Sequence, residues 1–123
     1  MELNEITEKV IGCAIKVHRA LGLGLLESTY EVCLAHELVK EGLKVKTQVA
    51  LPVVYDGLRL DAGYRIDMLV EDAVIVELKS IESLHPIHEA QVISYLKLSG
   101  KKIGLLINFN VKLLKGGIKR LVN

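Results

Sequence analysis

The stretch from Gly63 to Ser80, GYRIDMLVEDAVIVELKS, constrains the fold more than any other part of the chain. Its alternating pattern on both sides of Glu71 and Asp72 is typical of two antiparallel strands joined by a tight turn. The even-numbered positions form an apolar face: Tyr64, Ile66, Met68, Val70, Val74, Val76 and Leu78. The odd-numbered positions combine Leu69 and Ile75 with four charged residues: Arg65, Asp67, Glu77 and Lys79. The pattern therefore predicts a hairpin with one apolar face and one charged face.

The length of the loop decides which side chains of this hairpin face each other. A two-residue loop would pair Ile66 with Glu77 and mix the apolar and charged faces. A three-residue loop, 71–73, pairs Ile66 with Leu78 and keeps the apolar face intact. The sequence favours the second register, which places Asp67 opposite Glu77.

Two facing carboxylates are unfavourable in a sheet because like charges repel, and more so where water is excluded. A divalent cation between Asp67 and Glu77 would remove the conflict. Two carboxylates with a nearby backbone carbonyl, that of Leu78, form a hard ligand set that suits Mg²⁺ or Mn²⁺. Lys79 could then contact a phosphate or a developing charge. The simpler interpretation is a solvated face with diagonal ion pairs, Asp67 with Lys79 and Arg65 with Glu77.

Three helices are predicted outside the hairpin. Apolar residues at helical spacing indicate a helix over 4–21 and a second over 26–41, each followed by a glycine that ends it. A third helix is predicted over 85–100, with Pro86 in its first turn and Gly100 at its end.

The remaining segments predict strands. Residues 44–55 favour one strand, with Pro52 at a sheet edge or a bulge, and Asp56-Gly57 is a hairpin turn signal. Residues 102–109 favour a buried strand, and the tail, 111–123, a short helical turn or a final strand. The order α-α-β-β-β-α-β predicts an α/β (α+β) fold with a mixed sheet flanked by helices.

Length, charge and apolar spacing limit the class of protein. A chain of 123 residues suffices for one domain, 1–123. A net charge of +1 gives no overall basic surface for nucleic acid, so phosphate contacts must come from local lysines such as those of the tail. Apolar runs are too short for a membrane helix, and no signal peptide is recognisable. With two cysteines, a cytoplasmic protein without a membrane partner is expected.

The spacing of Asp67, Glu77 and Lys79 across a hairpin that is followed by a helix and a strand resembles the PD-(D/E)XK nuclease superfamily. In that pattern an acidic residue on one strand precedes (D/E)-x-K on the next. Ile66 stands where the proline of the family name would be.

Two further motifs strengthen the resemblance. Gln91 and Tyr95 lie four residues apart on the third helix and resemble the Q-x-x-x-Y motif of RecB-like and lambda-exonuclease-like members. Gly24, Glu27 and Tyr30 resemble the signature of the GxxExxY proteins, which are usually placed in the same superfamily.

The resemblance implies a restriction-endonuclease-like fold with a metal site on one edge of the sheet. The implied ligands of Mg²⁺ or Mn²⁺ are Glu27, Asp67 and Glu77, with the carbonyl of Leu78 beside them. Lys79 is implied as charge stabiliser or water activator, and Gln91, Tyr95 and Tyr30 as substrate-binding or site-shaping residues. Glu27 and Tyr30 also have structural explanations, since an acid suits a helix N-terminus and Tyr30 lies on an apolar stripe.

These features favour a metal-dependent nuclease that hydrolyses phosphodiester bonds of DNA or a related nucleic acid. The alternative is a non-catalytic module that binds nucleic acid or protein and retains a nuclease fold. A homodimer or a partner protein could complete either. A zinc site at Cys33 and His36 is less favoured because no compact set of further ligands accompanies them.

Overall fold

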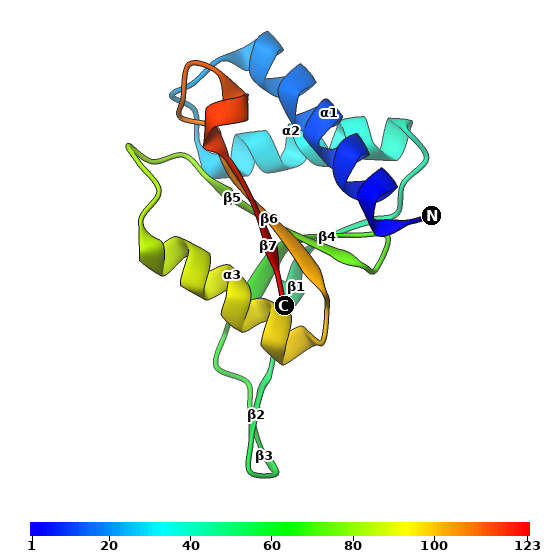
Figure 1. Cartoon of the computed structure of the whole chain (residues 1–123), viewed down its shortest axis with the longest axis vertical. Helices are drawn as coiled ribbons and strands as arrows, with labels where there is room; N and C mark the ends of the chain where they lie inside the picture. Colours follow the sequence, from blue (N-terminus) through cyan, green and yellow to red (C-terminus); the bar gives the residue numbers. More distant parts are fainter.

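A five-stranded mixed sheet, of order β1-β4-β5-β6-β7, forms the centre of the protein, whose computed structural model describes residues 1–123 (Figure 1). The elements in chain order are α1 (Leu3–Leu21), α2 (Glu27–Lys40), β1 (Val45–Ala50), β2 (Val53–Tyr55), β3 (Leu58–Leu60), β4 (Arg65–Val70), β5 (Val74–Lys79), α3 (Pro86–Ser99), β6 (Ile103–Asn108), the 3₁₀ helix η1 (Leu114–Gly117) and β7 (Ile118–Val122). Only β5 and β6 pair in parallel, and α3 connects them. None of the three helices has the length and apolarity that crossing a membrane requires.

The β4–β5 hairpin has the predicted register from its turn as far as Met68 and Val76, but the predicted pair of Ile66 and Leu78 does not form. Met68 lies opposite Val76, and Val70 opposite Val74, across a loop of three residues. Two of these, Glu71 and Asp72, have positive φ angles of 54° and 52°. A left-handed turn of this kind matches the twist of the strands that it joins.

Both faces of the sheet are covered, each by different helices (Figure 1). One core cluster joins the even-numbered residues of β4 and β5, such as Met68 and Val76, to α1 and α2. The second joins odd-numbered residues, such as Leu69 and Ile75, to Val92, Tyr95 and Leu96 of α3. Because helices cover both faces of the sheet, β4 and β5 have buried apolar side chains on both faces.

The predicted apolar face is wrong at two positions, Tyr64 and Ile66. Tyr64 precedes β4, is 47 % exposed and lies against Tyr95 of α3, with ring centroids 6.2 Å apart. Ile66 packs in the second cluster, with α3, whereas Met68 packs in the first. The even-numbered residues therefore change sides of the sheet at Asp67, beside Gln48 of β1, whose φ of 52° interrupts the extended backbone.

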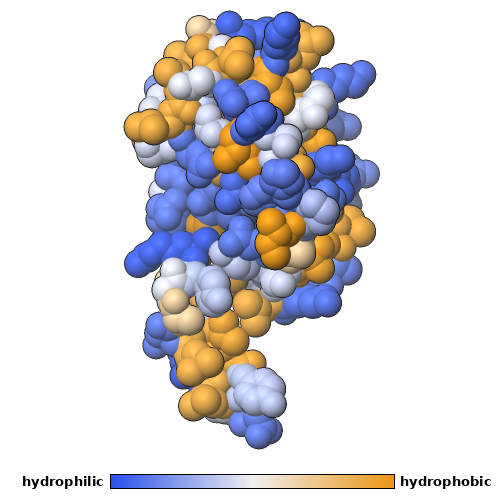
Figure 2. Space-filling view, turned by 90° about the vertical axis from the view of Figure 1, so that its left-hand side faces the viewer, coloured by the Kyte–Doolittle hydropathy of each residue, from blue (hydrophilic) through white to orange (hydrophobic).

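The single strand predicted over 44–55 is also wrong, because the chain leaves the sheet at Leu51 and Pro52. Pro52 has no N–H to donate to a ladder. β2 instead pairs with β3 in a separate hairpin around Asp56 and Gly57, both with positive φ. This hairpin projects away from the sheet (Figure 1) and forms a largely hydrophobic arm at one end of the molecule (Figure 2).

The chain therefore has more strands than predicted. β3 was not expected as a strand, and the tail forms both η1 and β7, with β7 antiparallel to β6. The mixed sheet flanked by helices is confirmed, while the order α-α-β-β-β-α-β omits these additional strands.

Candidate active site

Asp67 and Glu77 lie at the point where β4 and β5 separate. Each carboxylate bonds to the backbone of the facing strand. The Asp67 N–H donates to Glu77 Oε2 at 2.7 Å, and the Leu78 N–H donates to Asp67 Oδ2 at 2.9 Å. The regular pairing of β4 with β5 extends from the turn only to Met68 and Val76. Beyond that point, the carboxylates accept the N–H groups in place of backbone carbonyls. Two N–H groups hold the acids side by side, although like charges repel.

Burial makes this carboxylate pair difficult to ionise. Glu77 is 4 % exposed, and burial, followed by the charge of Asp67, raises its pKa to about 8. Burial also raises the pKa of Asp67, against the hydrogen bond from the Leu78 N–H. Desolvation disfavours the charged form of any carboxyl group, and a second carboxylate adds to the effect. Perturbed acids of this kind are typical of functional sites.

Neither diagonal ion pair of the simpler interpretation forms. The salt bridges of the protein join Lys16 and Lys40 to Glu37, Arg59 to Asp61 and Lys101 to Asp72. Arg65 donates to the backbone oxygen of Gln48 instead. The charges on β4 and β5 are therefore not explained as surface ion pairs.

Glu27 reaches the same site from the start of α2. Its Oε2 accepts a hydrogen bond of 3.2 Å from the N–H of Ser80, immediately after Lys79. The Ser80 hydroxyl donates in turn to the Leu25 carbonyl at 2.6 Å. These two contacts fasten the N-terminus of α2 to the end of β5. The side chain of Glu27 remains exposed and lines a cavity together with Asp67.

Tyr30 shapes the loop before α2 from inside the core. It is fully buried, and its ring stacks on Phe109 with centroids 4.4 Å apart. Its hydroxyl donates to the Gly22 carbonyl at 2.7 Å and accepts from the Leu25 N–H at 3.2 Å. Because the buried hydroxyl makes both of its hydrogen bonds to this loop, Tyr30 holds the loop in place and does not face a ligand.

Glu31 and Gln48 belong to the site, although the sequence analysis did not single them out. The Gln48 amide donates to Glu31 Oε1 at 2.7 Å and lies 3.5 Å from Asp67 Oδ1. Gln48 interrupts β1 with a φ of 52°, a conformation that non-glycine residues rarely adopt. Burial raises the pKa of Glu31, and the charge of Asp67 adds to it. No sequence signal points to Gln48, because it stands at a position where the alternation of residues 45–49 expects a polar side chain.

Three of the acids, but not the buried Glu77, line a cavity of about 260 Å³, whose full lining is Glu27, Ser28, Glu31, Gln48, Asp67 and Leu78. We call it the carboxylate cavity. Its oxygen donors suit Mg²⁺ or Mn²⁺ in their chemistry. No three His, Cys, Asp or Glu side chains are arranged to hold a metal ion together. Asp67 and Glu77 each give one oxygen to a backbone N–H, and each retains a second oxygen that does not.

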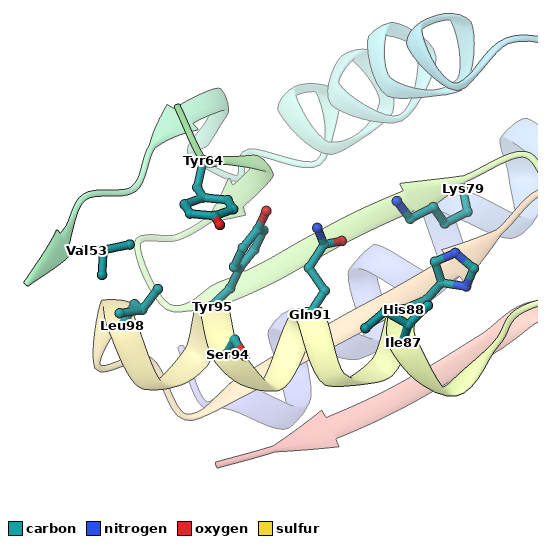
Figure 3. A pocket seen from close by; sticks show the side chains of 9 residues that line it. All are labelled: Val53, Tyr64, Lys79, Ile87, His88, Gln91, Ser94, Tyr95 and Leu98. Carbon is teal, nitrogen blue, oxygen red and sulfur yellow. The ribbon is translucent and has the colours of Figure 1, made fainter. Parts of the chain in front are cut away.

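A second cavity, of about 430 Å³, lies between α3 and the base of the β2–β3 hairpin. Lys79, two residues after Glu77, is part of its lining. We call this cavity the α3 groove. Its lining is Val53, Tyr64, Lys79, Ile87, His88, Gln91, Ser94, Tyr95 and Leu98 (Figure 3). Gln91 and Tyr95 thus share one face of α3, as their spacing indicates, and point into this groove with Lys79 (Figure 3).

Asn108 fixes the segment that follows Lys79. It is 2 % exposed and lies opposite Lys79 in the β5–β6 register. Its amide accepts from the Ile81 N–H and donates to the Ile81 carbonyl. The sequence analysis did not select Asn108, since a lone asparagine at the end of a buried strand has no distinctive spacing.

Other candidates lie away from the carboxylate cavity. Cys33 and His36 line an apolar depression between α1 and α2. The structure brings no further cysteine, histidine or acid to them as a metal-binding group.

The family model of the PD-(D/E)XK nuclease superfamily matches residues 4–121. The chain belongs to the PD-(D/E)XK nuclease superfamily. No curated protein and no solved structure matches it. Membership in the PD-(D/E)XK nuclease superfamily agrees with the observed mixed sheet and confirms the predicted restriction-endonuclease-like fold. It supports a nuclease-type function, and nucleases of this superfamily generally use divalent metal ions.

Proposed function

We propose that the protein is a metal-dependent nuclease that hydrolyses phosphodiester bonds of DNA or a related nucleic acid. The observation that carries the proposal is the pair of the half-buried Asp67 and the buried Glu77, two acids that lie side by side and form no ion pair with lysine or arginine. A fold keeps such a pair at a cost, because both carboxylates lose hydration and repel each other.

Asp67 and Glu77 would hold Mg²⁺ or Mn²⁺ through the oxygens that do not bond to the backbone. Glu27 would add a third carboxylate from α2, and the carbonyl of Leu78 a neutral oxygen. A cation bound there supplies a Lewis acid for the phosphate and lowers the pKa of a bound water. The N–H groups of Asp67 and Leu78 keep the two acids oriented toward each other before any ligand binds.

Lys79 would stabilise the negative charge that develops on the phosphate. Its Nζ forms no ion pair in the protein, and it lines the α3 groove next to the acids. A free ammonium at the edge of a partly buried site is well suited to a phosphoryl oxygen. Gln91 and Tyr95 would position the substrate in the α3 groove beside it.

The test is a calorimetric titration of Mn²⁺ into the wild type and Asp67→Asn, with cleavage of single- and double-stranded DNA assayed on the same samples. We expect binding and cleavage to disappear together in Asp67→Asn. Asp61→Asn is the matched control, because Asp61 is an exposed aspartate that pairs with Arg59 and lines neither the carboxylate cavity nor the α3 groove. It should bind and cleave like the wild type. A folded protein that binds no Mn²⁺ or Mg²⁺ at millimolar concentration would refute the proposal.

A second function, a binding module without turnover, is favoured by one observation. Asp67 and Glu77 are already satisfied by backbone N–H groups, and no three-ligand set is preformed. A fold that needs no cation to hold its acids can persist without catalysis. Specific binding of nucleic acid with no cleavage under any metal would support this second function.

A further inference from the structure

We propose that the α3 groove binds one unstacked nucleotide, so that the substrate is a single strand or a frayed end. The proposal deepens the proposed nuclease function and rests on it. It assigns roles to Tyr64 and to the apolar lining of the α3 groove, which the sequence motifs do not include.

The size and lining of the α3 groove suit a small, flat, partly polar ligand. Its volume of about 430 Å³ falls in the range of sites for single small molecules. One end is apolar, with Val53 and Leu98 below the ring of Tyr64 (Figure 3). The other end is polar, with Gln91 and Lys79 (Figure 3). A nucleotide has the same division between an aromatic base and a charged phosphate.

Tyr64 provides the surface for the base. It lies edge-to-face with Tyr95 at an interplanar angle of 64°, and 47 % of the residue remains exposed. Nearly half of this aromatic residue is therefore accessible to a ligand at the α3 groove, which Tyr64 lines. Bases stack on such rings with little regard to sequence. A base inside a duplex offers only its edges, so a base on Tyr64 must be unpaired.

The polar end contains donors that the protein leaves unused. Tyr95 is 6 % exposed, yet its hydroxyl forms no hydrogen bond within the protein. No buried polar side-chain atom lacks a partner, so this hydroxyl must open into the α3 groove that Tyr95 lines. The amide of Gln91 and the ammonium of Lys79 point into the same space (Figure 3). These three groups are therefore available to donate hydrogen bonds to a ligand in the α3 groove.

The α3 groove also continues to the candidate catalytic groups. Lys79 lines it and lies two residues from Glu77. The hydroxyl of Tyr95 is close enough to Glu77 and Asp67 for their charges to raise its pKa, after the larger effect of burial. A base on Tyr64 would therefore place its own phosphate near Lys79 and the acids. One strand could pass from the stacking surface to the carboxylate cavity without a second strand.

Binding is tested without cleavage, by fluorescence anisotropy of a labelled DNA strand of about 12 nucleotides, a length within the range of known single-strand sites. The same strand in a blunt duplex is the comparison, and both are measured in EDTA and in Ca²⁺. We expect the single strand to bind more tightly in at least one condition. Tyr64→Ala should weaken that binding about 10-fold or more, as stacking losses do. Tyr64→Phe should retain it, and Tyr55→Ala, which changes a 72 % exposed tyrosine on the hairpin arm, should not alter it.

Equal affinity for single strand and duplex, absence of binding to either, or unchanged affinity in folded Tyr64→Ala would each overturn the proposal. Cleavage in Mn²⁺, measured separately, distinguishes this failure from failure of the nuclease function. Cleavage at the wild-type rate in Tyr64→Ala would contradict the nucleotide site and still support the nuclease function. Binding that depends on Tyr64, without any cleavage, would support the nucleotide site and contradict the nuclease function. A protein ligand for the α3 groove would be indicated if neither nucleic acid binds, which is one of the overturning results.

Discussion

The substitution Glu77→Gln should stabilise the metal-free protein at alkaline pH. Burial and the charge of Asp67 raise the pKa of Glu77 from 4.5 to about 8 in the folded state. Between these two pH values the unfolded chain has lost the proton while the folded chain keeps it. Unfolding then releases a proton, so the free energy of unfolding of the wild type falls as pH rises through this window.

The size of the effect follows from the two pKa values. The gap between 4.5 and about 8 corresponds to a loss of at most about 5 kcal/mol, at about 1.36 kcal/mol for each pH unit. Small domains have stabilities of about 5–15 kcal/mol, so this loss is a large share of the total. Glutamine carries no charge at any pH, and its carbonyl can still accept the Asp67 N–H. The variant should therefore lack the decline caused by Glu77.

Urea unfolding followed by circular dichroism, in EDTA from about pH 5 to about pH 9, measures the difference. The wild type and Glu77→Gln should have similar stability at the acidic end and diverge toward the alkaline end. Glu8→Gln, the same change at an exposed position of α1, is the control and should follow the wild type. Parallel curves for the wild type and Glu77→Gln would refute the reasoning. Mn²⁺ at alkaline pH should restore stability to the wild type and not to Glu77→Gln.

Three further substitutions test how the site is held. Tyr30→Phe should lower the free energy of unfolding by about 1–2 kcal/mol in urea unfolding, because it removes both hydrogen bonds of a fully buried hydroxyl. Asn108→Ala should cost about 1–3 kcal/mol by the same measurement, since the Ile81 N–H and carbonyl lose their partner. Gly117→Ala should cost about 1–3 kcal/mol or prevent folding, because its Cβ would meet the Asn108 carbonyl, whereas Gly116→Ala has open space and should change thermal stability little.

The parts of the fold that the sequence predicts are those set by local pattern. The β4–β5 register follows from alternation that only one loop length satisfies. Two helices, α1 and α2, follow from apolar spacing and from the glycines after them, and α3 follows from Pro86 in its first turn and Gly100 at its end. Gln91 and Tyr95 share a face of α3 because residues four apart must do so.

The parts that it does not predict depend on contacts between distant segments. Gln48 joins the site because α2 packs beside β1 and brings Glu31 within hydrogen-bond distance. Tyr64 and Ile66 leave the predicted apolar face because the alternation of β4 changes sides at Asp67, beside the positive φ of Gln48 on β1. Pro52 indicates a disturbance in a strand, but an edge position, a bulge and the end of a strand are equally consistent with it.

The bonds between the site acids and the backbone make two amides part of any cation site. The N–H groups of Asp67 and Leu78 occupy one oxygen of each acid and leave the other oxygen to a cation. A cation held by these other oxygens fixes both carboxylates and keeps the strand pair closed around them. Amide hydrogen exchange at Asp67 and Leu78 should accordingly become slower when the site is filled. These two amides are thus a built-in reporter of occupancy that can be followed in the absence of any catalytic turnover.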